Sequence, residues 1–130
     1  VVATFEMRHM DKAVTDQFYA DIQAMAKEIS NCEFTFVNTV AKYSTPCDPA
    51  LIDTIDHVCT GLNISHIIMP SGAGHDANPM AHEGVPIGMV FVPSVKGISH
   101  HGDEWTDPKH IDLGADVLYE TVLALDKTDL

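Results

Sequence analysis

Basic residues are scarce in this sequence: Lys and Arg number 7 against 19 Asp and Glu among 130 residues, a formal net charge of −12. An acidic surface of this kind repels phosphate groups, so we expect neither nucleic acid nor an anionic membrane as a partner. Apolar runs are short, and none approaches the ~18 residues that a membrane span needs. The first residues lack the basic and apolar regions of a signal peptide, and they are typical of a strand already begun, so we expect them to belong to a longer chain.

Cysteine is also scarce. Cys32, Cys47 and Cys59 show no CxxC spacing, which excludes a disulfide framework and a structural zinc motif. We therefore expect reduced, buried thiols in a cytoplasmic protein. What is present is ordinary for a globular chain, with 45% hydrophobic and 20% charged residues. This composition predicts one domain, or at most two small ones, with a core of its own.

The first part of the chain predicts a strand–helix–strand unit. Residues 1–8 alternate and carry the β-branched and aromatic side chains typical of a strand. Asp11 stands at an N-cap position, and a helix is expected to run to about Ile29. Its apolar residues recur at three- and four-residue steps and predict one buried stripe, made of Val14, Phe18, Ile22, Met25 and Ile29. Residues 33–40 alternate again and predict a second strand.

Two prolines within residues 44–49 disfavour both a helix and a central strand, so we place a domain boundary or hinge there. Beyond it, the pattern predicts a helix over 50–60 that Gly61 ends, and a last helix that ends near Leu125. That last helix is expected to bury Ile111, Ala115, Leu118, Val122 and Leu125. Short apolar runs at 64–69 and 87–92 predict strands buried in a parallel sheet. The predicted fold class is therefore α/β, in a mixed α+β arrangement.

Two polar loops follow the predicted buried strands, at residues 70–85 and 93–108. Ligand sites in open α/β sheets lie beyond the carboxyl ends of strands, which is where both loops are expected. Gly72 and Gly74 allow the backbone to approach a ligand, and both loops pair His with Asp or Glu. The spacing alone leaves open whether these are a metal or acid–base site or ordinary turns. The isolated histidines are interpreted as structural or surface residues: His9, His57, His66, His82 and His110.

Three ordered motifs closely resemble the C-terminal part of the M20-type metal-dependent amidohydrolases. They are MPSGAGHDA at 69–77, GMVFVPS at 88–94 and GISH at 97–100. The most similar branch is the amidase/hydantoinase/carbamoylase group, which includes N-carbamoyl-L-amino acid hydrolases, β-ureidopropionases, allantoate amidohydrolases and ureidoglycolate hydrolases. Arg8-His9 also matches the Phe-x-x-Asp-Ile-Arg-His strand of that group, whereas Glu6 aligns only loosely with its Asp. The resemblance extends over nearly the whole chain.

The resemblance implies the C-terminal part of a two-domain fold. Residues 1–47 would be the end of an inserted lid that also forms a homodimer, and residues 48–130 the last part of the catalytic α/β domain. It also implies a dinuclear centre, usually zinc and sometimes manganese, which polarises the scissile carbonyl and activates water, together with a Glu general base.

The metal and substrate-carboxylate roles carry over to single positions. His100 matches the last metal ligand of the family, and its neutral imidazole suits zinc. Arg8 matches the lid arginine that holds the carboxylate of the substrate, a task that suits a guanidinium fork.

The glycine loop and three catalytic-site residues also carry over. Gly72, Ala73 and Gly74 match a loop whose backbone faces the substrate. The implied catalytic-site residues are His75 and Asp76, at the wall of the site, and Glu104, in a supporting role.

The implied function is metal-dependent hydrolysis of the C–N bond of small N-carbamoyl or ureido acids. The other metal ligands and the general base of the family lie in upstream segments, so this chain alone is expected to be inactive, with the rest supplied by upstream sequence or another chain. Three alternatives stay open. The first is an N-acyl amino acid or dipeptide hydrolase, and the second is a non-catalytic interaction or dimerisation module. The third is a small metal-binding protein that uses His75, His82, His100 and His101.

Overall fold

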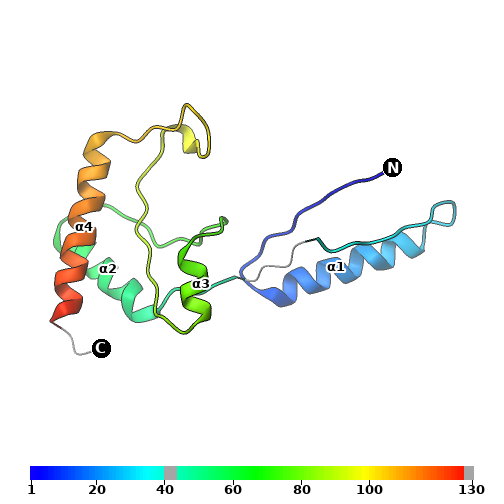
Figure 1. The fold of residues 1–130 in the computed structure, drawn as a ribbon, viewed down its shortest axis with the longest axis horizontal. Helices are drawn as coiled ribbons and strands as arrows, with labels where there is room; N and C mark the ends of the chain where they lie inside the picture. Colours follow the sequence, from blue (N-terminus) through cyan, green and yellow to red (C-terminus); the bar gives the residue numbers. More distant parts are fainter. Residues whose placement is uncertain (40–43, 128–130) are drawn as a thin grey trace. The chain divides into compact units, whose positions relative to one another are not determined.

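A computed structural model describes residues 1–39 and 44–127 of the chain (Figure 1). Its helices are α1 (Lys12–Lys27), α2 (Pro49–Gly61), α3 (Ala77–His82), the short 3-10 helix η1 (Val95–Gly97) and α4 (Pro108–Asp126). The chain divides into two compact units. The first unit comprises Val1–Thr45 with Pro70–His75, and the second comprises Pro46–Met69 with Asp76–Leu130. The assignment of residues 1–47 to a lid and 48–130 to a catalytic domain stays a prediction.

Helix α1 confirms the N-cap that the sequence predicts. The Asp11 side chain accepts a hydrogen bond from the backbone N–H of Ala13 at 2.8 Å, which satisfies one of the free donors of the first turn. The helix ends at Lys27, two residues before the expected Ile29. The stripe expected to be buried is not: Val14, Phe18, Met25 and Ile29 are exposed. Among the described residues of the first unit, none buries this face, so the helix is amphipathic but uncovered there.

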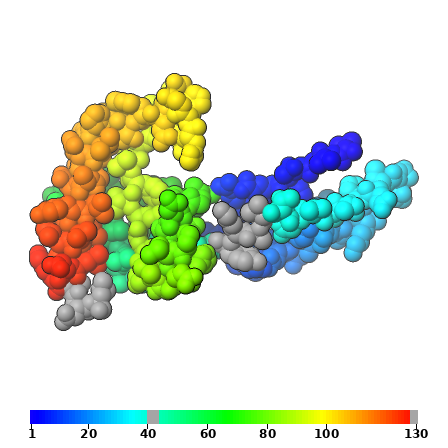
Figure 2. Space-filling view, viewed as in Figure 1, coloured from blue at the N-terminus to red at the C-terminus, as the bar shows by residue number. Residues whose placement is uncertain are grey.

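The predicted strands are not formed by the described residues. Residues 1–8, 33–39, 64–69 and 87–92 carry no strand assignment, and Figure 1 draws them as extended traces; Val40 lies outside the described residues. A strand is defined by hydrogen bonds to a neighbouring strand, and side-chain alternation does not supply that neighbour. The segment 33–39 instead packs beside α1 (Figure 2). The Phe36 ring stands edge-on to the Tyr19 ring, with 6.1 Å between the ring centroids, and is stacked with the Phe34 ring, with 6.5 Å between the centroids.

Helix α2 has well-formed ends. The Asp48 carboxylate accepts from the backbone N–H groups of Ala50 and Leu51 at 2.8 and 3.2 Å, and Pro49 occupies the first turn, where its missing N–H costs nothing. At the other end, the left-handed residue is Asn63, with φ of 55°, whereas Gly61 is still helical. The Asn63 and Ile64 N–H groups bond back to the last turn of α2. The prediction that this helix ends at Gly61 is therefore confirmed, although the left-handed residue that follows its end is Asn63.

Helices α2 and α4 pack against each other and enclose the core of the second unit. Cys59 on α2 and Val117 and Thr121 on α4 are buried. Burial, with a smaller contribution from the Asp56 charge, raises the pKa of the Cys59 thiol above its ordinary value, so this thiol stays protonated.

The face of α4 expected to be buried is turned outward. Ile111, Leu118 and Val122 are exposed, whereas Val117 and Thr121, each one residue away from an expected position, are buried. Helix α4 therefore carries apolar residues on two adjacent faces, and the sequence pattern does not say which of them packs on α2.

Helix α3 lies where the sequence predicts a loop. Its six residues include Pro79 in the first turn, the position where proline fits a helix. Gly84 ends it with a φ of 83°, and the N–H groups of Gly84 and Val85 bond back to Ala81 and Met80. None of the helices in the described residues is both long and apolar enough to cross a membrane.

Candidate functional site

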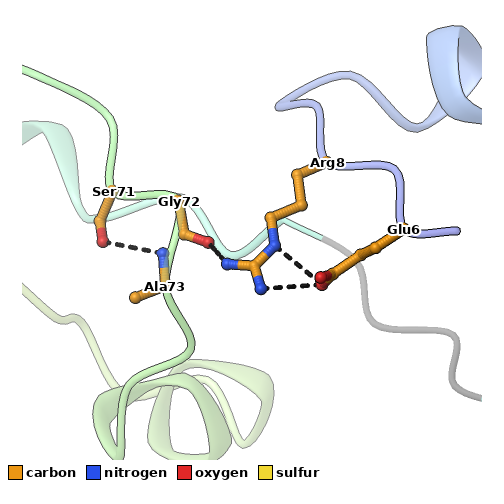
Figure 3. Close-up of polar contacts among 5 residues, drawn as sticks. All are labelled: Glu6, Arg8, Ser71, Gly72 and Ala73. Atoms are coloured by element: carbon orange, nitrogen blue, oxygen red, sulfur yellow. Dashed lines mark hydrogen bonds and ion pairs between the residues drawn. The ribbon is translucent and has the colours of Figure 1, made fainter. Parts of the chain in front are cut away.

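Arg8 lies at the centre of a polar cluster in the first unit (Figure 3). Its Nε and Nη2 atoms each lie 2.8 Å from Oε1 of Glu6, and its Nη1 donates to the carbonyl oxygen of Gly72. Glu6 and Arg8 are two residues apart on an extended segment, so both side chains leave the backbone on the same side. Gly72 is 64 positions away in the sequence. The guanidinium therefore links the N-terminal segment to the loop 70–75.

The Glu6–Arg8 pair is a charged, exposed pair. The exposed fractions of the two side chains are 59% for Arg8 and 69% for Glu6. The hydrogen bond from Arg8, and then its charge, lowers the pKa of the Glu6 carboxyl below its ordinary value. The same two causes, now from Glu6, raise the pKa of Arg8. Arg8 is also the only arginine in the sequence, so no other residue here offers a guanidinium fork.

The glycine loop next to Arg8 is organised by Ser71. Its Oγ accepts a hydrogen bond from the backbone N–H of Ala73 at 3.2 Å and lies 2.7 Å from Nε2 of His75. A Cβ added at Gly72 or Gly74 would meet nothing within 4 Å among the described residues. The loop therefore has open space at both glycines, and Ser71 holds the ring of His75 to the loop.

His100 lies in a tight loop of the second unit, before α4. Its backbone is left-handed, with φ of 56°, a conformation that His adopts more readily than most residues but that still carries strain. Its N–H donates to Oε2 of Glu104 at 2.8 Å, and the N–H of Glu104 donates to the carbonyl of His101 at 3.0 Å. Glu104 therefore holds the backbone of His100 in place through a charge-assisted bond.

The neighbouring groups are engaged in local contacts. The Nδ1 atom of His101 accepts from the Asp103 N–H at 3.1 Å and lies 3.6 Å from the Asp103 carboxylate. Ser94 Oγ donates to the carbonyl of Ile98 at 2.6 Å, which ties the start of the loop across η1. Asp76 directly precedes α3, and its side chain makes no capping bond to that helix.

The predicted site residues therefore gather into two clusters. Arg8, Gly72 and Ala73 lie together in the first unit, with His75 joined through Ser71, and Gly74 belongs to the same loop. In the second unit, His100 and Glu104 lie together, and Asp76 stands at the start of α3.

The part of the chain that the structure describes gives no support to a metal site formed by this chain alone. The described residues contain no group of three or more His, Cys, Asp or Glu side chains that could hold a metal ion. His100 can contribute one imidazole of the kind that zinc prefers, but one ligand does not hold a metal pair. The alternative in which His75, His82, His100 and His101 hold a metal by themselves is likewise unsupported.

Two side-chain contacts are not predicted from the sequence. Glu6 is the partner of Arg8, a relation that their two-residue spacing on an extended segment could have indicated. His66, interpreted from sequence as an isolated structural residue, bonds through Nε2 to Asp56 at 2.8 Å and through Nδ1 to the Ile64 carbonyl at 2.9 Å. The bond to Ile64 first, and then that to Asp56, raise the pKa of His66, because only the charged ring can donate to both. Neither helix nor strand periodicity indicates a contact between residues ten positions apart, such as His66 and Asp56.

The chain belongs to the peptidase family M20/M25/M40, whose model matches residues 3–124. It is 34% identical to an N-carbamoyl-L-amino-acid amidohydrolase of Pseudomonas sp. (strain NS671), over 92% of this chain and 30% of that protein. It is 33% identical to the allantoate amidohydrolase of Escherichia coli (strain K12), over 80% of this chain and 26% of that protein.

A solved structure agrees with the family assignment. A crystal structure from Burkholderia cenocepacia, described as an amidohydrolase/peptidase, is 36% identical and superimposes with a TM-score of 0.75 over 89% of this chain. That match covers 29% of the Burkholderia chain. The chain thus spans about 30% of the length of the relatives it matches.

Proposed function

We propose that the complete protein containing these residues hydrolyses the C–N bond of small N-carbamoyl or ureido acids. The observation that carries the proposal is the Arg8 guanidinium held against the open glycine loop. Such acids carry a carboxylate, and an arginine fork is the side chain best suited to bind one. The amidohydrolase names of the relatives support the same reaction class.

In this proposal each residue has a defined task. Arg8 binds the substrate carboxylate, and the backbone of Gly72, Ala73 and Gly74 lies along the substrate. His75, fixed through Ser71, lines the wall of the site next to that loop.

The metal and the remaining residues complete the proposed mechanism. His100 would supply one imidazole to a pair of zinc or manganese ions, and such a pair would polarise the scissile carbonyl and activate water. Glu104 keeps the backbone of His100 in place. Asp76, like His75, belongs to the wall of the proposed site. The other ligands and the general base come from upstream sequence or from another chain.

The proposal extends to the assembly and its location. The uncovered apolar face of α1, with Val14, Phe18 and Met25 exposed, supports a homodimer formed through residues 1–47. The three cysteines are free, which supports a cytoplasmic location, where thiols stay reduced. The expectation that all three are buried is wrong, because Cys32 is exposed and Cys47 is half-buried.

The substrate class is tested by hydrolysis assays on the complete protein with zinc or manganese. We expect turnover of N-carbamoyl-L-amino acids or allantoate, and weaker turnover of N-acetyl amino acids and dipeptides. Faster turnover of the acyl compounds would favour the N-acyl hydrolase alternative, and turnover of none would contradict the proposal.

The role of Arg8 is tested with Arg8→Ala. We expect KM for the carboxylate substrate to rise about ten- to a hundredfold, the loss typical of a hydrogen bond between charged groups. Lys12→Ala is the matched control, because it removes an exposed cation of the same unit that pairs with Asp16. A substrate amide without the carboxylate should be insensitive to Arg8→Ala. Equal effects on both substrates would contradict the assigned role.

The metal role of His100 is tested by the metal content of the complete protein. His100→Ala should lose bound metal, whereas His101→Ala, next to it in the same loop, should retain it. An unchanged metal content in His100→Ala would favour the non-catalytic module.

A further inference from the structure

Glu6 occupies one particular edge of the Arg8 guanidinium. A single oxygen, Oε1, lies 2.8 Å from both Nε and Nη2, the two nitrogens on one side of the planar group. The opposite nitrogen, Nη1, donates to the Gly72 carbonyl, so the guanidinium is held from two sides (Figure 3). A planar group held at both sides has a defined orientation.

The contacts leave donors for a ligand. A guanidinium carries five N–H donors, and the contacts to Glu6 and Gly72 use three of them. One donor on Nη1 and one on Nη2 stay outside these contacts. A carboxylate bound in the two-pronged manner needs two such donors on one group. Glu6 thus holds the guanidinium without consuming the donors that a substrate carboxylate requires.

The Glu6–Arg8 pair has little to contribute to folding stability. Both side chains are more than half exposed, and exposed ion pairs of this kind contribute little. Its effect lies in the order that it imposes on a long side chain. A free arginine must lose its rotamer freedom when a ligand binds, and that loss weakens binding. The negative charge of Glu6 opposes an incoming carboxylate, but water and salt weaken this repulsion at an exposed site. We expect the ordering effect to exceed the repulsion.

We propose that Glu6 is the positioning residue of the substrate-carboxylate site, holding the Nε–Nη2 edge of Arg8 so that the rest of the fork is presented beside the Gly72 loop. This inference rests on the proposed function, because it assigns Glu6 a task in the binding of the same carboxylate by Arg8.

The test compares four variants of the complete protein: Glu6→Ala, Glu6→Gln, Arg8→Ala and the double variant Glu6→Ala/Arg8→Ala. Glu6→Ala should raise KM about three- to tenfold with kcat nearly unchanged, the loss expected for one side chain that must now be ordered on binding. Glu6→Gln keeps an oxygen that can accept both hydrogen bonds and should restore KM to within about twofold. The double variant should be no worse than Arg8→Ala, since Glu6 acts only through Arg8.

The control and the contrary outcomes are distinct. Asp16→Ala removes another exposed, ion-paired carboxylate of the same unit and should leave KM unchanged. A lower KM in Glu6→Ala would show that Glu6 competes with the substrate, and an unchanged KM would show that Arg8 needs no partner; either overturns this inference alone. An unchanged KM in Arg8→Ala would instead overturn the carboxylate site of the proposed function, and the role of Glu6 with it.

Discussion

Single residues in this chain owe their properties to partners that are near in space. His66 is the clearest case, because its two ring nitrogens face the Ile64 carbonyl and the Asp56 carboxylate. The charged ring donates to both, whereas the neutral ring can donate to only one. The folded state therefore binds the proton more tightly than the unfolded chain does, and the pKa of His66 lies above its ordinary value of 6.5.

This raised pKa predicts how stability depends on pH. The contribution of His66 is fully present below pH 6.5 and is lost as the pH rises through the higher pKa of the folded state. Asp56→Asn should lower the pKa of His66 only in part, because the Ile64 carbonyl, the larger cause, stays in place. A pH titration of the His66 ring signals by NMR measures the shift. Asp53→Asn, an exposed change on the same helix, should leave it unchanged, and an equal shift in both variants would contradict the pairing.

At the scale of secondary-structure elements, the closest packing at any glycine of the described residues is between α4 and the segment 87–92. A Cβ at Gly114 would lie 2.5 Å from Cγ1 of Val92. A Cβ at Gly88 would lie 3.2 Å from both Ile55 Cδ1 and Leu51 Cβ. The two glycines therefore allow the extended segment to pass close to both α2 and α4.

Gly114→Ala sets two effects against each other. In the interior of a helix, alanine is about 1 kcal/mol more stabilising than glycine, but overpacking destabilises the fold by about 1–3 kcal/mol. The β-branched side chain of Val92 cannot easily rotate away from the added methyl group. We expect a net loss of about 1 kcal/mol in the free energy of unfolding, measured by urea denaturation of the complete protein.

Two further variants make this prediction specific. Val92→Ala should relieve the clash, so the double variant should be more stable than the sum of the single changes predicts. Gly61→Ala is the control and should be neutral or stabilising, because no described residue lies within 4 Å of the methyl group added in α2. Stabilisation by Gly114→Ala would contradict the close approach.

For the whole molecule, the main observation is how little apolar surface the chain covers. In the described residues the buried hydrophobic side chains are Cys59, Ile87 and Val117. Residues Ile67, Ile68 and Met69 are exposed, together with one face of α1 and one of α4. Exposed apolar surface of this extent marks regions that contact other protein. The roughly 30% share of the relatives that the chain spans points the same way.

The complete protein should therefore have an intact mass well above 14.2 kDa under denaturing conditions. Mass spectrometry of the protein isolated from its source measures this directly. A mass of 14.2 kDa would mean that a partner chain supplies the missing ligands, and a pull-down with this chain would then be the next experiment.

Local features of the fold could be predicted from the sequence. Asp11 and α2 lie where capping residues and apolar spacing predict them, because a helix forms its hydrogen bonds within its own segment. The motifs around Arg8 and His100 likewise predict the family that the comparison confirms. Short-range information is sufficient for these features.

Non-local features could not be predicted in the same way. The alternating segments at 1–8 and 87–92 predict strands, yet pairing requires a second strand that the described residues do not provide. The spacing of α4 reveals apolar faces, but packing on α2 selects the one with Val117. Arg8 and Gly72 are 64 positions apart, and His66 and Asp56 are ten positions apart. Such pairings depend on how the chain turns in space, because side chains distant in sequence meet only after folding.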